Sequence, residues 1–218
     1  MAQHLTQNSM HPSNLPGAGL FHLPGYQLHE YQLVLALPDA LKERLKKVRQ
    51  QFQETYQTAP QGQSPILLPL VKFRQRPVLE ERMVLSLQQV VSSWKPVALH
   101  LKDFGSAPAH SIYIPVTSPL PLQSMVRGLK GVQSLLKADR ENQPHFPDEH
   151  RVFVASRIPR QVYENAWLAY SHKKFTGQFM ADACLLLKRK TGSQYWQILR
   201  RMEFRNLPLG VSQGSLFA

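Results

Sequence analysis

The sequence predicts an α+β protein built as two similar lobes that face each other across a central cleft. Short apolar stretches suited to strands alternate with segments whose apolar residues recur every three or four positions, as on one face of a helix. The order strand, helix, strand, helix, strand occurs in the first half of the 218-residue chain and again in the second half, where one more strand follows. A chain of this length can bury a substantial core, and a cleft between two lobes is a common place for a ligand.

The first half contains three predicted strands and two predicted helices. Residues 31–37 (YQLVLAL) alternate as the two faces of a strand do, and Asp39 can cap the helix that follows. That helix carries one apolar stripe, formed by Leu41, Leu45, Val48, Phe52 and Tyr56. The later strands are ILLPLVKF (66–73) and VALHLKDF (97–104), and the second helix between them carries apolar residues from Leu79 to Val91.

The second half repeats this order and adds a final strand. Its predicted strands are SIYIPV (111–116), RVFVASRI (151–158), FMADACLLLK (179–188) and YWQILRRMEF (195–204). Apolar stripes at helical spacing predict a helix over 122–136 and another over 162–170. The two halves therefore share an order of elements, although few residues are identical between them.

Positive charge is the strongest signal in the composition. The formal net charge is +12 at pH 7 and the isoelectric point is about 10.0. Such a surplus favours a polyanionic partner such as RNA, because neutralised phosphates release counterions; scattered lysines can also serve only to keep a surface solvated. Residues 188–190 and 200–205 hold six basic residues against one acidic residue. Tyr195 and Trp196 lie between these clusters and suit either base stacking or the core of the last strand.

The two ends of the chain differ from its middle. Residues 1–25 contain no Lys, Arg, Asp or Glu, include several Pro and Gly, and predict an extended N-terminal arm. The N-terminus lacks the pattern of a secretory signal, and no apolar run approaches the roughly 20 residues of a membrane helix. The single cysteine, Cys184, excludes an internal disulfide and is compatible with a reducing compartment. We therefore expect a cytoplasmic protein with no membrane partner.

Three stretches resemble the 2H phosphoesterase superfamily, which includes the 2'-5' RNA ligase and cyclic nucleotide phosphodiesterase families. They are YQLVLALPDALKERL, VALHLKDFGSAPAHSIYIPV and ADACLLLKRKTGSQYWQILRRMEF. The resemblance covers residues 26–205 and implies two pseudo-symmetric lobes of antiparallel sheet, with helices packed outside and a cleft between them. Residues 206–218 would then form a C-terminal tail, and the family chemistry would require no cofactor and no metal.

The family signature, H-x-S/T-x once per lobe, is absent from both expected positions. Alternate residues of a strand share a face, so each motif offers one imidazole for proton transfer and one hydroxyl for a phosphate oxygen. Alignment with the family places Leu67 and Pro69 at the first motif and Val152 and Val154 at the second. Because neither leucine nor valine can exchange a proton, the resemblance implies a degenerate active site.

Basic residues on or beside the two central strands are the candidates for phosphate contact, and they are Lys72, Arg74, His150 and Arg157. The leading hypothesis is a non-catalytic protein that binds RNA or a nucleotide phosphate. A competing hypothesis is an active 2',3'-cyclic phosphodiesterase or RNA ligase whose site has shifted to His150. A third is a non-enzymatic scaffold or self-assembling protein whose apolar cleft accepts a peptide or its own arm.

Overall fold

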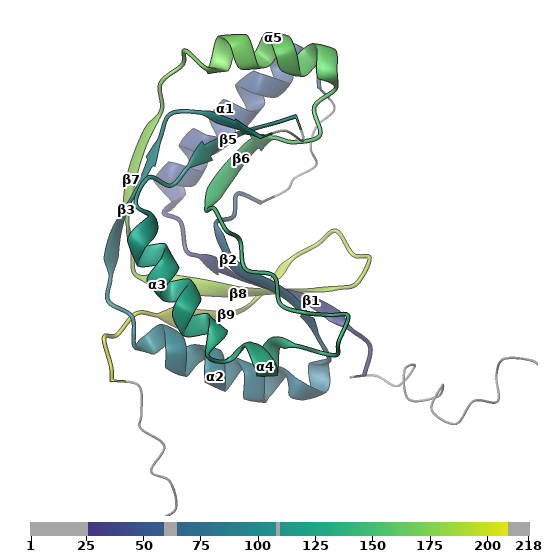
Figure 1. Cartoon of the computed structure of the whole chain (residues 1–218), viewed down its shortest axis with the longest axis vertical. Helices are drawn as coiled ribbons and strands as arrows, with labels where there is room; N and C mark the ends of the chain where they lie inside the picture. The colour runs from purple at the N-terminus through teal and green to yellow at the C-terminus, as the bar shows by residue number, and fades with distance from the viewer. Residues whose placement is uncertain (1–25, 59–64, 108–109, 209–218) are drawn as a thin grey trace, which may run out of the picture.

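The computed structural model describes residues 26–58, 65–107 and 110–208, which fold as two lobes (Figure 1). The first lobe contains an antiparallel sheet in the order β2-β1-β8-β9. Its strands are β1 (His29–Leu35), β2 (Pro69–Gln75), β8 (Ala183–Lys190) and β9 (Gln197–Glu203). The helical elements of this lobe are η3 (Pro77–Leu79), α2 (Glu80–Ser92), α3 (Pro119–Lys130) and α4 (Gln133–Leu136). Helix α2 lies along the outer face of this sheet, below it in Figure 1.

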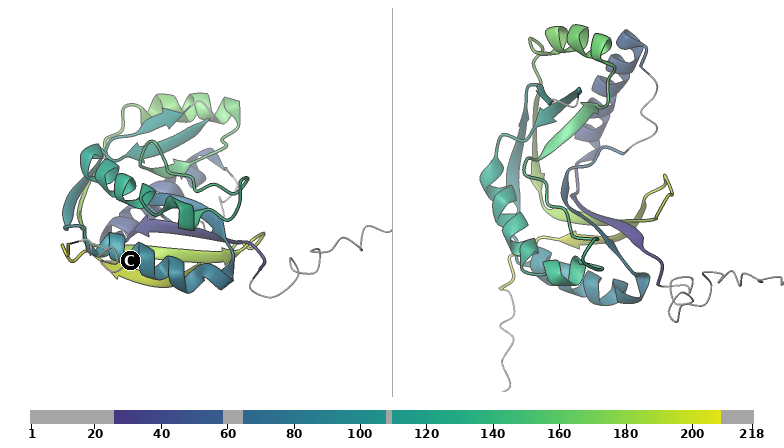
Figure 2. Two further views of the ribbon diagram at one scale, coloured as in Figure 1. Left: turned by 60° about the horizontal axis from the view of Figure 1, so that its bottom comes forward. Right: turned by 45° about the vertical axis from the view of Figure 1, so that its right-hand side comes forward.

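The second lobe contains two small antiparallel sheets. One pairs β3 with β7, and the other has the order β4-β5-β6; a single bridge from Leu101 to Val116 connects them. The strands are β3 (Val97–Lys102), β4 (Gly105–Ala107), β5 (Ser111–Pro115), β6 (Arg151–Ala155) and β7 (Thr176–Ala181). The helices are α1 (Asp39–Tyr56) and α5 (Arg160–Tyr170), and α1 packs against β6. The views in Figure 2 show β3 and β7 joining the two lobes along one side of the molecule.

An aromatic cluster fills the centre of the second lobe. Phe52 of α1 is completely buried, and its ring centroid lies 4.9 Å from that of Tyr56 and 5.5 Å from that of Tyr170. The ring of Phe104 also belongs to the cluster, with its centroid 4.9 Å from that of Tyr170. The predicted apolar stripe of α1 is confirmed, because Leu41, Leu45 and Phe52 are its buried residues. The α+β class, the two lobes and the antiparallel sheets are likewise confirmed.

Two sequence predictions about the strands are wrong. The stretch 179–188 forms two strands, β7 and β8, which meet at Asp182 and belong to different lobes: Ala181 pairs with Val97, whereas Ala183 pairs with Glu203. The two halves of the chain also do not correspond to the two lobes, because each sheet system takes strands from both halves. Both errors have one cause: hydrophobic periodicity reveals a strand but carries no information on its distant partner.

Other expectations concern the ends of the structure. The arm over 1–25 and most of the tail over 206–218 lie outside the described residues. Asp39 is the first residue of α1, and the N-cap position belongs to Pro38, which makes no side-chain capping bond. In the part of the chain that the structure describes, no helix has both the length and the apolar character needed to cross a membrane.

Candidate functional site

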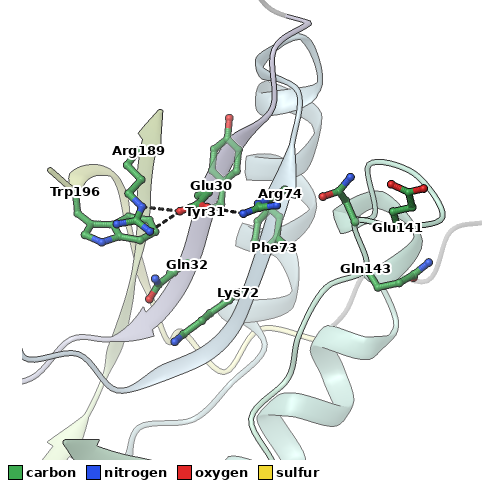
Figure 3. Close-up of a pocket in the computed structure, with 11 residues that line it drawn as sticks. Glu30, Tyr31, Gln32, Lys72, Phe73, Arg74, Glu141, Gln143, Arg189 and Trp196 are labelled. Carbon is green, nitrogen blue, oxygen red and sulfur yellow. Dashed lines mark hydrogen bonds and ion pairs between the residues drawn. The ribbon is translucent and has the colours of Figure 1, made fainter. Parts of the chain in front are cut away.

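A polar pocket of about 370 Å³ lies on the first lobe, over β1, β2 and β8 (Figure 3). Its polar lining residues are Glu30, Gln32, Lys72, Arg74, Glu141, Asn142, Gln143 and Arg189, and Trp196 adds an aromatic ring. The charged and amide groups come from three neighbouring strands and from the segment 141–143. The pocket therefore collects polar groups that lie far apart in the sequence.

Strand register places these side chains on one face of the sheet. Glu30 is opposite both Arg74 and Arg189, and Gln32 is opposite Lys72. Register partners share a face, so these five residues point the same way. The intervening residues Tyr31 and Phe73 face the other side, where both are buried and their rings stack at 5.4 Å. The Tyr31 hydroxyl donates to Glu80 of α2 at 2.8 Å, which shows that the pocket lies on the face opposite α2.

Glu30 lies between two arginines at the centre of the pocket. Arg74 Nη2 donates to Glu30 Oε1 at 3.0 Å, and Arg189 Nε donates to Glu30 Oε2 at 2.6 Å. Burial alone would raise the pKa of Glu30, but the hydrogen bonds from Arg189 and Arg74 outweigh that effect and lower it. The shared carboxylate fixes the position of both guanidinium groups at neutral pH.

Replacement of Glu30 with glutamine should change the acid dependence of stability. Because the pKa of Glu30 is lower in the folded chain, its stabilising contribution is full above the ordinary value of 4.5 and is lost as pH falls through the lower folded-state value. We expect Glu30→Gln to lower the free energy of unfolding by roughly 1–2 kcal/mol at pH 7, with the difference from wild type shrinking as pH falls below 4.5. Urea unfolding across this pH range measures both effects.

Glu164→Gln is the matched control, because Glu164 is exposed and pairs with Arg160 only within α5. Its effect at pH 7 should be within about 0.5 kcal/mol. An equal loss in the two variants, or a Glu30→Gln difference that does not shrink as pH falls below 4.5, would contradict the assigned role of the Glu30 carboxylate.

Lys72 is the basic residue of the pocket without a carboxylate partner among the described residues. Its side chain is exposed, yet partial desolvation lowers its pKa and the neighbouring charge of Arg189 lowers it further. The Lys72 backbone is fixed by a reciprocal pair of hydrogen bonds to His145, at 2.9 and 2.7 Å. A cation that has like-charged neighbours and no counter-ion is a suitable contact for an anionic ligand.

The structure brings together two of the four predicted phosphate-binding residues. Lys72 and Arg74 line the same pocket, while His150 and Arg157 line two other pockets. His150 precedes β6, and its Nε2 is buried without a hydrogen-bond partner among the described residues. Burial lowers the pKa of His150. Arg157 lies in the turn after β6 with a φ of 54°.

The four motif-equivalent positions carry no group that can exchange a proton. Leu67 precedes β2 and Pro69 begins it, and both are partly buried. Val152 and Val154 of β6 are only 1% and 4% exposed and belong to the hydrophobic core. Nor do the described residues contain a group of three or more His, Cys, Asp or Glu side chains that could hold a metal ion, so the stretch PHFPDEH forms no such group.

Sequence reasoning missed Glu30, Gln32 and Arg189 as pocket residues and left two interpretations open for Trp196. The structure places Trp196 at the pocket wall, half-buried and outside the core cluster, with the Arg189 guanidinium 4.5 Å from its ring centroid. The basic cluster at 188–190 was a signal in the sequence, but alternation alone could not decide which of its members faces the pocket. That choice depends on the register of β8 against β1.

Comparison with known proteins supports the fold and goes no further. No protein-family model and no curated protein matches the sequence. Escherichia coli LigT complexed with 3'-AMP is 13% identical with a TM-score of 0.63, covering 82% of this chain and 99% of LigT. TT0787 of Thermus thermophilus is 15% identical with a TM-score of 0.56, over 81% and 98% of the two chains. A crystal structure titled phosphoesterase is 12% identical with a TM-score of 0.57, over 81% and 98%. The chain therefore has a LigT-like fold.

Proposed function

We propose that this protein binds RNA or a nucleotide phosphate in the pocket over β1, β2 and β8 and does not carry out the phosphoesterase reaction. The observation that supports this most directly is Lys72, which lines the pocket with Arg74 and Arg189 and has no counter-ion within residues 26–58, 65–107 and 110–208. A phosphate at Lys72 would gain a charge-assisted hydrogen bond without first breaking an ion pair. The structures of LigT with 3'-AMP, ATP and NADP+ are consistent with this ligand class, since they record nucleotides bound to proteins of the same fold.

The proposed absence of turnover follows from the chemistry of the residues. General acid–base cleavage of a phosphodiester needs two groups that can exchange protons on opposite sides of the phosphate. Leucine, proline and valine occupy the four positions that would supply the imidazoles and hydroxyls. The cations of the pocket can bind a phosphate and balance its charge, but neither Arg74 nor Arg189 can serve as the base, because arginine stays protonated.

One observation favours the competing hypothesis of an active enzyme at His150. The lowered pKa of His150 keeps its imidazole neutral near pH 7, which is the form that a general base requires, and its Nε2 lacks a partner among the described residues. His150 borders a separate pocket of about 390 Å³ together with Tyr113, Asp148 and Arg151. A shifted active site would therefore use a different part of the surface from Lys72.

The experiment that tests the proposal combines turnover and binding on one substrate. We expect a short single-stranded RNA ending in a 2',3'-cyclic phosphate to remain uncleaved by the wild-type protein and by His150→Ala. The same RNA should bind with a steep salt dependence. If three cations contact phosphates, log K should fall with log salt with a slope of about −2, so that raising the salt fourfold weakens binding roughly 20-fold.

Three results are informative. Turnover by the wild type that is lost in His150→Ala would establish the competing enzyme and overturn the proposal. Binding that is undetectable or insensitive to salt would also overturn it. Salt-dependent binding without turnover, equal in wild type and His150→Ala, is the expected result.

A further inference from the structure

The pocket face of the first sheet changes character from one edge to the other. Two rows of side chains cross its strands. One row runs Lys72, Gln32, Leu187 and Ile198, each the register partner of the next. The other runs Arg74, Glu30 and Arg189, and the Trp196 ring lies beside Arg189 (Figure 3). Where these two rows meet β2 the face is thus basic, whereas at their β9 end it carries the Trp196 ring and the side chain of Ile198.

The aromatic end of this face is fixed in position. The Arg189 guanidinium lies 4.5 Å from the centroid of the Trp196 ring, in a cation–π contact. Arg189 is in turn held by Glu30, whose other oxygen accepts from Arg74. The orientation of the Trp196 ring is therefore supported by Arg189, which Glu30 holds at the centre of the pocket. A ring held in this way loses little freedom when a second planar group stacks against it.

Beyond Trp196, the same face of the sheet carries an exposed aliphatic side chain. Ile198 is 65% exposed, and its side chain lies on the same face as the pocket residues. The amide of Gln32 lies between these two ends, whereas the segment that carries Asn142 and Gln143 runs along the outer edge of β2, on the side away from Trp196 (Figure 3). Each of these amides can both donate and accept hydrogen bonds. The distance across the four strands is three strand spacings, roughly 14 Å. From β2 towards β9 the face thus offers cations, the amide of Gln32, and then the aromatic and apolar surface of Trp196 and Ile198.

We propose that the ligand of this pocket is single-stranded nucleic acid whose base stacks on Trp196 while its phosphate contacts Lys72. This inference rests on the proposed function and specifies its ligand. A free phosphate or a bare sugar–phosphate chain would use only the β2 edge. A single strand of two or more nucleotides with an accessible base can use both ends, because every base has a face that can stack on an indole and an edge that can bond to an amide. Paired bases in a duplex are not available for this contact.

The test compares two fluorescent ligands of equal length and charge: a single-stranded RNA decamer and the corresponding abasic chain. Stacking on one aromatic side chain typically changes affinity by roughly 5-fold to 100-fold. We expect the wild-type protein to bind the decamer more tightly than the abasic chain by a factor in this range. Trp196→Ala should weaken binding of the decamer much more than binding of the abasic chain and so remove the preference, and Trp196→Phe should retain most of the preference.

Tyr195→Ala is the matched control. Tyr195 is the adjacent aromatic residue, is 83% exposed and does not line the pocket, so its removal should change the preference by less than about twofold. The comparison of the two ligands on the wild-type protein keeps the inference testable even if Trp196→Ala does not fold.

The outcomes separate this inference from the proposed function. Equal binding of the decamer and the abasic chain by the wild type would overturn the stacking site and leave phosphate binding intact. Equal losses for both ligands in Trp196→Ala would also overturn it, since Trp196 would then support the structure of the pocket without contacting a base. Failure of the wild type to bind either ligand would overturn the proposed function itself.

Discussion

Reversal of charge at Lys72 should weaken binding of single-stranded RNA by at least about tenfold at low salt. Lys72→Glu removes a cation of the pocket and places a carboxylate on the face that already holds Glu30, so a bound phosphate would meet repulsion. The slope of log K against log salt should also become less negative by about 0.7, the value expected for one lost phosphate contact on a single strand. Titrations by fluorescence anisotropy at several salt concentrations measure both quantities.

Lys95→Glu provides the control with the same change in net charge. Lys95 is exposed and lies in the connection between α2 and β3, outside the pocket lining. We expect at most a twofold to threefold loss from the altered long-range field. If the two variants weaken binding equally, net charge alone explains the affinity and the pocket over β1 and β2 is not the binding site.

Truncation of Phe52 to alanine should produce the largest loss of stability, about 3–5 kcal/mol in the free energy of unfolding. The ring is completely buried and contacts Tyr56 of its own helix and Tyr170 of α5. Alanine would leave a cavity between α1 and α5 that the rigid aromatic neighbours cannot fill. Chemical denaturation followed by circular dichroism measures the loss.

Leu168→Ala serves as the comparison, since Leu168 lies on α5 but is 69% exposed. Its effect should stay within about 0.5 kcal/mol. A loss below about 1 kcal/mol in Phe52→Ala would mean that α1 and α5 do not share the aromatic cluster described above.

Local pattern in the sequence was sufficient to predict most elements of the fold. The apolar stripe of α1 and the alternation in β2 are properties of consecutive residues, and both are present in the structure. The division at Asp182 was missed because β7 and β8 together read as one apolar run with a single acidic residue inside it. Only the pairing of Ala181 with Val97 and of Ala183 with Glu203 separates them, and no local pattern encodes such partners.

The same limit applied to the pocket. Lys72 and Arg74 are two residues apart on one strand, so alternation was enough to place them on a common face. Glu30 and Arg189 form an ion pair although they are 159 positions apart in the sequence. That contact depends on the register between β1 and β8. The candidate site was therefore visible in the sequence only where it is local.

The interleaved strand order also has a consequence for how the protein is made. The first sheet places β8 between β1 and β9, so a nascent chain can pair β1 with β2 early but cannot complete the sheet until residues 183–203 have left the ribosome. Until then β1 exposes the edge that β8 will occupy, and an unpaired edge favours association with other chains. Arg189 and Trp196 are part of this segment, so the pocket is assembled only after residues 183–203 have emerged. A chain that stops before β8 therefore lacks the complete pocket.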